Sequence, residues 1–216
     1  MRADIDGDAD RDEGRSARKR RVVLEAAAEL FLRNGYLGTS MDEVASIAGV
    51  SKQTVYKHFA DKEGLFQEIV LATIDQVGEP FYDAVPSLGD TVDVDADLRA
   101  LARGLVAIVM RPHLLQLRRL VIAEAGRFPE LGRTYYERGP GRTADALAAH
   151  FELLAARGLL DVDDPALAAS HFLWLVVSIP LNAVMFGGSE TQFTSRQLNR
   201  FADAGARAFL EGYRRR

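Results

Sequence analysis

The stretch from Gly38 to Phe66 decides the fold and reads GTSMDEVASIAGVSKQTVYKHFADKEGLF. Within it, Ser40 and Glu43 stand three residues apart, the spacing of a capping box, so we expect a helix to begin at Met41. Gly49 follows the apolar residues of that helix and suits a turn with positive φ. The pattern therefore predicts a short helix that ends in a tight turn.

A second helix is predicted over residues 52–59, with Ser51 as its cap. Val55 and Phe59 stand four residues apart and should face inward. The outward side chains are cationic, amide, hydroxyl and aromatic without an acid, which suits contact with the major groove of DNA. They are Lys52, Gln53, Thr54, Tyr56, Lys57 and His58. The two helices predict a DNA-binding helix-turn-helix, and an ordinary helical hairpin with a polar outer face is the alternative.

The net charge of −4 does not by itself favour binding to negatively charged DNA, but the charge is distributed unevenly along the chain. Residues 1–14 carry six acids and two arginines, net −4, whereas residues 15–62 carry nine Lys or Arg and five Asp or Glu, net +4. The positive charge therefore coincides with the predicted DNA-binding segment. The basic run at residues 15–21 is either a set of phosphate contacts or the solvated start of a helix over residues 18–34.

Long segments rich in Ala, Leu, Glu and Arg, without strand alternation, predict an all-α protein of about nine helices. After a helix over residues 62–84 we expect a loop at 85–96. Further helices should cover residues 97–110, 112–127, 130–157, 165–186 and 196–213, with kinks at Gly139-Pro140 and Pro180. The predicted domains are a disordered acidic tail (1–14), a three-helix DNA-binding domain (15–64) and a helical ligand-binding and dimerisation domain (65–216).

Several classes of protein are disfavoured. The chain has no cysteine, which suits a reducing cytoplasm, and its first fourteen residues lack the apolar core of a signal peptide. Residues 165–186 are long and apolar enough to cross a membrane, but polar residues and Pro180 interrupt them, so we expect a buried core helix and no membrane. No phosphate-binding loop, nucleophile elbow or zinc-protease motif occurs, so we expect no enzyme.

No metal or cofactor is expected, because the four histidines lie far apart in the sequence. A metal site from His113, His150 and His171 would require three helices to converge. The charged residues Arg118, Arg119 and Glu124 form either a solvated, salt-bridged face or a source of charge for a ligand.

From Val22 to Phe66 the chain resembles the TetR family of bacterial transcription regulators. The resemblance rests on the segments AAAELFLRNGY, TSMDEVA, AGVSKQTVYKHF and DKEGLF. It implies base or phosphate contacts by the second helix of the helix-turn-helix and a phosphate contact by Lys62. The predicted DNA-binding residues are Ser40, Lys52, Gln53, Thr54, Tyr56, Lys57, His58 and Lys62.

The second half, with RRLVIAEAGRFPELGRTYYERG and AASHFLWLVVSIPLNAVMFG, is similar to the ligand-binding region of the AefR/AcrR-like branch of the family. This similarity implies a ligand pocket and a dimer built from the last two helices. Aromatic and apolar residues with a few hydroxyls and amides would suit a hydrophobic or aromatic small molecule. Any one of these residues, taken alone, is more commonly part of a hydrophobic core. The predicted ligand-binding residues are Met110, Val121, Tyr136, Phe151, Trp174, Ser178 and Asn182.

One stripe of the last predicted helix contains Leu198, Phe201, Gly205 and Phe209. Glycine destabilises a helix interior, so Gly205 is expected where another helix comes close. We assign this stripe to the dimer interface.

The sequence thus predicts a ligand-responsive transcription regulator, with repression as the default. It should bind a palindromic double-stranded DNA operator as a homodimer in the cytoplasm and be released by a small apolar or aromatic effector. The competing hypothesis is a helical small-molecule binder or enzyme whose helix-turn-helix serves another purpose. The salt dependence of binding to duplex DNA distinguishes the two.

Overall fold

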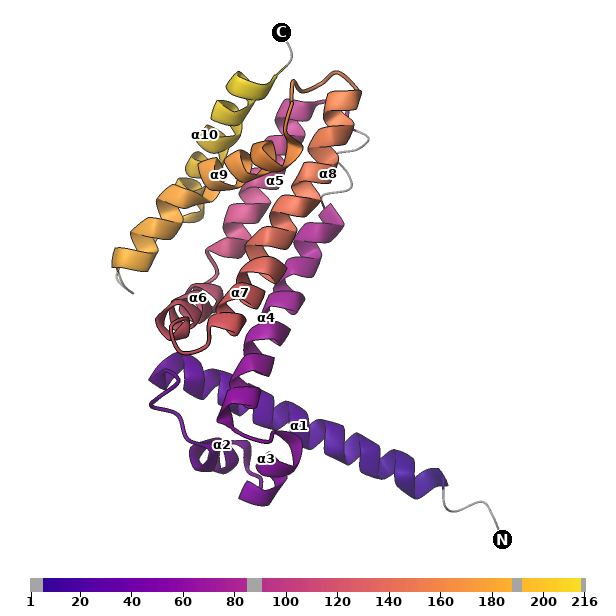
Figure 1. The fold of residues 1–216 in the computed structure, drawn as a ribbon, viewed down its shortest axis with the longest axis vertical. Coiled ribbons are helices and arrows are strands. Elements are labelled where there is room, and N and C mark those ends of the chain that lie inside the picture. Colours follow the sequence, from indigo (N-terminus) through magenta and orange to yellow (C-terminus); the bar gives the residue numbers. More distant parts are fainter. Residues whose placement is uncertain (1–5, 85–90, 188–191, 215–216) are drawn as a thin grey trace. The chain divides into compact units, whose positions relative to one another are not determined.

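The computed structural model describes residues 6–84, 91–187 and 192–214, with side chains described from residue 14 onward except in 76–84. These residues form ten α-helices and one π-helical segment, and their only β-structure is an isolated bridge between Leu160 and Arg214 (Figure 1). The predicted all-α class is confirmed. The elements are α1 (Asp6–Asn34), α2 (Met41–Ala48), α3 (Lys52–His58), α4 (Lys62–Ala84), α5 (Val94–Val109), α6 (Pro112–Glu124), α7 (Pro129–Tyr136), η2 (Glu137–Gly141), α8 (Arg142–Ala156), α9 (Pro165–Gly187) and α10 (Ser195–Tyr213).

The chain divides into two compact units. Unit 1 comprises Met1–Thr73 and Leu120–Leu131, and unit 2 comprises Ile74–Arg119 and Gly132–Arg216. The DNA-binding unit therefore extends past the predicted boundary at residue 64 and includes a segment from the second half of the chain. Helices α4 and α6 each begin in one unit and end in the other.

Unit 1 contains the predicted helix-turn-helix. Ser40 caps α2, since its Oγ accepts a hydrogen bond from the backbone N–H of Glu43 at 3.1 Å. Gly49 ends this helix at φ 64°, in the left-handed region that favours glycine. Ser51 caps α3 by accepting from the N–H of Thr54 at 3.2 Å. Local hydrogen bonds therefore fix where both helices begin.

An aromatic cluster forms the core of unit 1. The ring of Tyr36 lies 6.0 Å from Phe31, 5.2 Å from Phe66 and 4.8 Å from Phe128, measured between ring centroids. Phe128 belongs to the segment that joins this unit from later in the chain. The ammonium of Lys62 lies 4.3 Å from the centre of the Tyr36 ring, so the start of α4 is held against the same cluster.

Two predicted boundaries are wrong. Helix α1 begins at Asp6, so residues 6–14 continue the helix instead of forming a disordered tail, and residues 1–5 lie outside the described residues. Helix α5 begins at Val94, because the Asp93 side chain accepts from the N–H of Ala96 and caps it. The loop predicted at 85–96 therefore ends before residue 94. Its residues 85–90 lie outside the described residues.

The core of unit 2 lies among α5, α8, α9 and α10, with α10 packed on both α5 and α9 and α8 packed on α9. Phe151, Phe172 and Phe209 are fully buried there, and the centroid distances from Phe209 to the other two rings are 5.0 and 5.2 Å. Helix α9 has the length and composition of a membrane span, but nine of its residues are buried in this protein core. It is the central core helix that the sequence predicted.

Gly205 lies where α10 crosses α9. A Cβ atom at this position would stand 2.6 Å from the carbonyl oxygen of Leu175 and 2.9 Å from the Cα of Val176. The prediction that another helix approaches Gly205 is correct, but that helix belongs to the same chain. Assigning Gly205 and Phe209 to a dimer interface is therefore wrong, because both are buried against α9 and α5.

Leu198 and Phe201, the other two residues of the predicted interface, also contact residues of their own chain. Leu198 packs against the core of unit 2 and is half-buried, and Phe201 lies edge-on to Phe193 at 5.5 Å. The apolar stripe of α10 thus covers the core, since a helix with one apolar face buries that face first against its own domain.

The expected kink at Gly139-Pro140 is replaced by the π-helical segment η2. Pro140 lies inside it, and the chain remains helical from α7 through α8. A π turn accommodates an extra residue, which lets the helix continue past a proline that donates no backbone hydrogen bond.

We predict that Gly205→Ala destabilises the protein by about 1–3 kcal/mol, because the added methyl meets backbone atoms that cannot move aside. Gly212→Ala on the same helix is the matched control, since a Cβ there meets nothing within 4 Å. Thermal unfolding should give a lower midpoint for Gly205→Ala and an unchanged or slightly higher one for the control. Equal midpoints would contradict the close crossing.

Candidate DNA-binding surface and ligand cavity

The outer face of α3 presents polar side chains to solvent. Lys52, Gln53, Tyr56 and Lys57 are exposed, and Tyr56 is 51% exposed despite its large apolar ring. On the inner face Val55 is fully buried, and Phe59 just beyond the helix end is also buried. This division between faces is the one that the sequence predicted.

Three of the exposed groups on α3 are free to bind a partner. The side chains of Gln53, Tyr56 and Lys57 have no hydrogen bond or ion pair within the described part of the chain. Lys52, in contrast, pairs with Asp42 of α2, with 2.5 Å between Nζ and Oδ2. The free groups include an amide, a phenol and an ammonium, which together can contact base edges and phosphates.

The other residues of the helix-turn-helix that were predicted to contact DNA already form contacts within the chain. Thr54 is half-buried and its hydroxyl lies 2.9 Å from that of Ser51, while His58 is half-buried beside Phe59. The Ser40 hydroxyl is exposed and accepts the capping hydrogen bond, so its own proton stays available to a phosphate oxygen. These residues support the helix ends as well as any contact with DNA.

Lys62 is engaged within unit 1, so a phosphate contact by this residue stays a prediction. Its ammonium donates to the backbone carbonyls of Tyr36 and Thr39, at 2.9 and 3.0 Å, and it also lies over the Tyr36 ring. The side chain therefore points into unit 1 and satisfies carbonyls of the α1–α2 connection. Sequence showed the charge of Lys62 but not its direction.

Part of the basic run on α1 is also engaged in contacts within unit 1. Arg20 forms an ion pair with Glu68, and its guanidinium carbon lies 5.4 Å from the centre of the Phe59 ring. Arg18, Lys19 and Arg21 are exposed. Phosphate contact by this run therefore remains a prediction for the exposed residues, while Arg20 ties α1 to α4.

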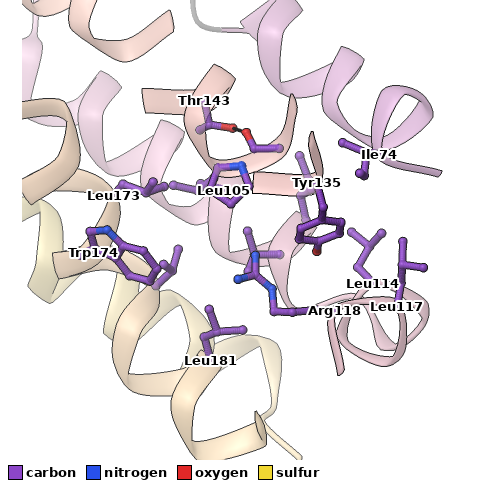
Figure 2. A pocket seen from close by; sticks show the side chains of 15 residues that line it. Ile74, Leu105, Leu114, Leu117, Arg118, Tyr135, Thr143, Leu173, Trp174 and Leu181 are labelled. Atoms are coloured by element: carbon purple, nitrogen blue, oxygen red, sulfur yellow. Dashed lines mark hydrogen bonds between the residues drawn. The ribbon is translucent and has the colours of Figure 1, made fainter. Parts of the chain in front are cut away.

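Unit 2 contains a cavity of about 110 Å³. Its walls are mostly aliphatic. They are formed by the part of α4 that belongs to unit 2 and by the elements from α5 to α9. Figure 2 shows Trp174 on one side and Tyr135 on the other, with Leu105 and Arg118 between them. An apolar, partly enclosed space with a few polar groups is typical of a small-molecule site.

Of the seven residues predicted to bind a ligand, Trp174 alone lines this cavity. Tyr136 is 57% exposed, whereas its neighbour Tyr135 lines the wall. Consecutive helical residues point about 100° apart, so an error of one position sends the ring to another face. The sequence located the aromatic pair but could not choose between its two members.

The other predicted ligand residues belong elsewhere. Val121 is buried in unit 1, and Phe151 belongs to the aromatic core of unit 2. Met110 packs against that core from the end of α5. Asn182 is exposed and its amide donates to the carbonyl of Ser178 at 2.8 Å. Ser178 is half-buried and, like these residues, does not line the cavity.

Among the described side chains, three polar ones line the cavity beside Trp174: Arg118, Tyr135 and Thr143. The guanidinium carbon of Arg118 lies 5.9 Å from the centre of the Tyr135 ring. Burial raises the pKa of the Tyr135 phenol, although the nearby Arg118 charge acts in the opposite direction. The phenol therefore stays neutral near pH 7 and can donate a hydrogen bond.

The described residues contain no group of three or more acidic, histidine or cysteine side chains that could hold a metal. His150 Nδ1 lies 2.8 Å from the carbonyl oxygen of Ala146, and His171 Nδ1 lies 2.6 Å from the hydroxyl of Tyr213. His113 is exposed at the start of α6. These three histidines do not converge on one site.

Comparison with known proteins agrees with this architecture. Residues 23–69 match the model of bacterial regulatory proteins of the tetR family, and residues 96–215 match the C-terminal domain of AefR-like transcriptional repressors. The second match alone covers more than half of the chain. The chain belongs to the TetR family.

Solved structures of TetR-family members align over nearly the whole chain. A TetR-family regulator from Mesorhizobium loti has 47% identity and a TM-score of 0.86, and the alignment covers 93% of this chain and 98% of that one. The flavonoid-responsive regulator FrrA has 32% identity and a TM-score of 0.69, over 93% and 99% of the two chains. AibR, in complex with isovaleryl coenzyme A and operator DNA, has 25% identity and a TM-score of 0.60, over 86% and 96%.

Curated relatives match over a limited part of the chain. The regulator YhgD of Bacillus subtilis is 39% identical over 71 residues, which are 32% of this chain and 37% of YhgD. AcrR of Shigella flexneri is 40% identical over 60 residues, 28% of each chain. The match thus spans 37% of the length of YhgD and 28% of that of AcrR.

We predict different effects for two exposed residues of α3. Gln53→Ala should relax sequence preference by about 1–3 kcal/mol if the amide reads a base, whereas Lys57→Ala should weaken binding to all duplexes and lower the salt slope by about one. The measurement is fluorescence anisotropy with the duplex selected in vitro by the wild type and with random duplex, at several salt concentrations.

The control for charge is Arg111→Ala, which removes one positive charge from an exposed position of unit 2. Its affinity for DNA should equal that of the wild type. Wild-type affinity in both α3 variants would show that this face does not bind DNA.

Proposed function

We propose that this TetR-family regulator is a homodimeric repressor that releases a palindromic operator when a small apolar or aromatic effector fills the cavity of unit 2. The observation that carries the proposal is the presence of two separate sites in one chain. One is the set of free polar groups on α3, and the other is the cavity beside Trp174. The protein would act in the cytoplasm by binding, with no catalytic step.

A palindromic operator follows from the small size of the reading element. Helix α3 has seven residues, so one copy can touch few base pairs. Two copies related by a two-fold axis would double the contacts and would read half-sites spaced by about one helical turn, roughly 34–36 Å, or a multiple of it. Dimerisation is therefore part of the DNA-binding proposal.

The outer face of α9 is the best candidate for the dimer contact. Leu167, Leu175, Ile179 and Phe186 are 50%, 42%, 61% and 89% exposed, although all are large and apolar. Their spacing of eight, four and seven residues places them along one side of the helix. A contiguous exposed apolar stripe is costly in a monomer, so burial against a second copy would stabilise it.

An effector could act through the helices that run between the two units. Helices α4 and α6 both begin in one unit and end in the other, and both contribute residues to the cavity wall. A ligand that binds one arrangement of α4 or α6 better than another would change DNA affinity, and DNA would change ligand affinity by the same factor. The flavonoid-responsive regulator FrrA, and AibR, which is solved in complex with both isovaleryl coenzyme A and operator DNA, support this proposal.

We predict that Ile179→Glu produces monomers and lowers operator affinity, because two charges would be buried at the two-fold contact. Analytical ultracentrifugation at micromolar concentration measures the assembly. The matched control is Leu153→Glu on α8, a leucine that is 51% exposed outside the α9 stripe, and it should remain dimeric. A wild type that sediments as a monomer would refute the proposed interface.

We also predict that ligands which quench tryptophan fluorescence release the operator. Trp174 is the only tryptophan and lines the cavity, so the signal reports on that site. Operator affinity should fall about five- to 150-fold at ligand saturation. Free N-acetyltryptophanamide, titrated in parallel, corrects for light absorbed by the ligand. Full quenching with unchanged operator affinity would separate the cavity from DNA binding and disprove the switch.

A further inference from the structure

Among the residues whose side chains the structure describes, Arg118 is the single cation on the wall of the cavity. It projects from α6 among aliphatic residues, and Figure 2 shows its guanidinium directed into the space between Trp174 and Tyr135. The side chain is half-buried, so part of its surface has already left water. A charge in such a place requires a reason, because an apolar residue would pack there without desolvation cost.

Neighbouring arginines donate to a backbone carbonyl or pair with a carboxylate, whereas Arg118 contacts only the neutral side chain of Tyr135 among the groups recorded for it. Arg119 donates to the carbonyl of Val184 at 2.5 Å, and Arg127 pairs with Glu124 at 3.6 Å. Arg118 has no ion pair with any acidic group that the structure describes; its contacts are a hydrogen bond to the phenol of Tyr135 and the approach of its guanidinium to the Tyr135 ring. Tyr135 can orient the guanidinium, but a guanidinium has five N–H donors and one neutral phenol oxygen can accept from only one or two of them, so the charge still lacks an anionic partner.

These contacts determine which ligand the cavity favours. A neutral apolar molecule would displace water from the guanidinium and leave a buried charge without a partner, which costs free energy. A carboxylate would accept two parallel hydrogen bonds from the same group. We propose that the effector is an apolar or aromatic monocarboxylate whose acid group binds Arg118, an inference that rests on the proposed role of this cavity as the effector site.

The other polar groups fit this arrangement. The Tyr135 phenol is a neutral donor that can give a second hydrogen bond to the carboxylate. The Thr143 hydroxyl donates to the carbonyl of Gly139 at 2.9 Å, so its proton is already used. The volume of about 110 Å³ compares with the ~150 Å³ cavity that binds benzene in another protein. One aromatic ring, or a short branched chain, is the size that the closed part of the cavity admits.

The test uses ligand pairs that differ in charge and share their shape. Phenylacetate is compared with phenylacetamide, and 3-methylbutanoate with 3-methylbutanamide, on the full chain without DNA. Binding is followed by Trp174 fluorescence and by isothermal titration calorimetry. In the wild type each carboxylate should bind at least about ten-fold more tightly than its amide, as a charge-assisted pair of hydrogen bonds would give.

Arg118→Met keeps the length and apolar stem of the side chain and removes the charge. In this variant the preference for the carboxylate should disappear or reverse, while Arg118→Lys should retain part of it. Arg111→Met removes the same charge from an exposed position outside the cavity and should keep the full preference. Thermal unfolding of each variant checks that it is folded.

The proposal is overturned if the amides bind as tightly as the carboxylates, if the preference survives in Arg118→Met, or if none of the four molecules binds. Operator release is measured separately with the same ligands. Release by the amides alone would leave the repressor function standing and exclude the carboxylate. Carboxylate binding through Arg118 without release would support the ligand class and contradict the switch.

Discussion

The core of unit 1 depends on the ring of Tyr36, which two cations approach. The ammonium of Lys62 is 4.3 Å and the guanidinium carbon of Arg127 is 5.6 Å from its centre, and Phe31, Phe66 and Phe128 surround it. Lys62 also satisfies two carbonyls of the connection that leads into α2. The helix-turn-helix is therefore not self-contained: its core requires a segment that the chain supplies some sixty residues later.

In unit 2 the corresponding constraint is the crossing of α9 and α10 at Gly205. Because the two backbones nearly touch there, the apolar stripe of α10 is used within the chain, and α9 is left with apolar side chains on its outer side. The same helix also contributes Trp174 to the cavity wall. Different faces of α9 thus contribute to the core, to the cavity wall and to the exposed apolar surface. This explains why α9 is apolar almost all round.

Sequence reasoning succeeded where the cause is local and failed where it depends on distant partners. The caps at Ser40 and Ser51 and the turn at Gly49 follow from hydrogen bonds within a few residues, so they could be predicted. The direction of Lys62 depends on carbonyls more than twenty positions away, and the partner of Gly205 depends on how three helices pack. Within the cavity, Trp174 was predictable as an aromatic residue on a long apolar helix, whereas Tyr135 and Arg118 required the actual rotation of α7 and α6.

The π-helical segment at Glu137–Gly141 separates two parts of what would otherwise be one helix. A π turn holds one residue more than an α turn, so it rotates α7 relative to α8 by about 100°. Tyr135 precedes this segment and lines the cavity, while Leu147 and Phe151 follow it in the core. A gain or loss of one residue here would turn the tyrosine away and leave the core in register. Related chains can therefore acquire new ligand selectivity by changing length at this point, without redesigning the fold.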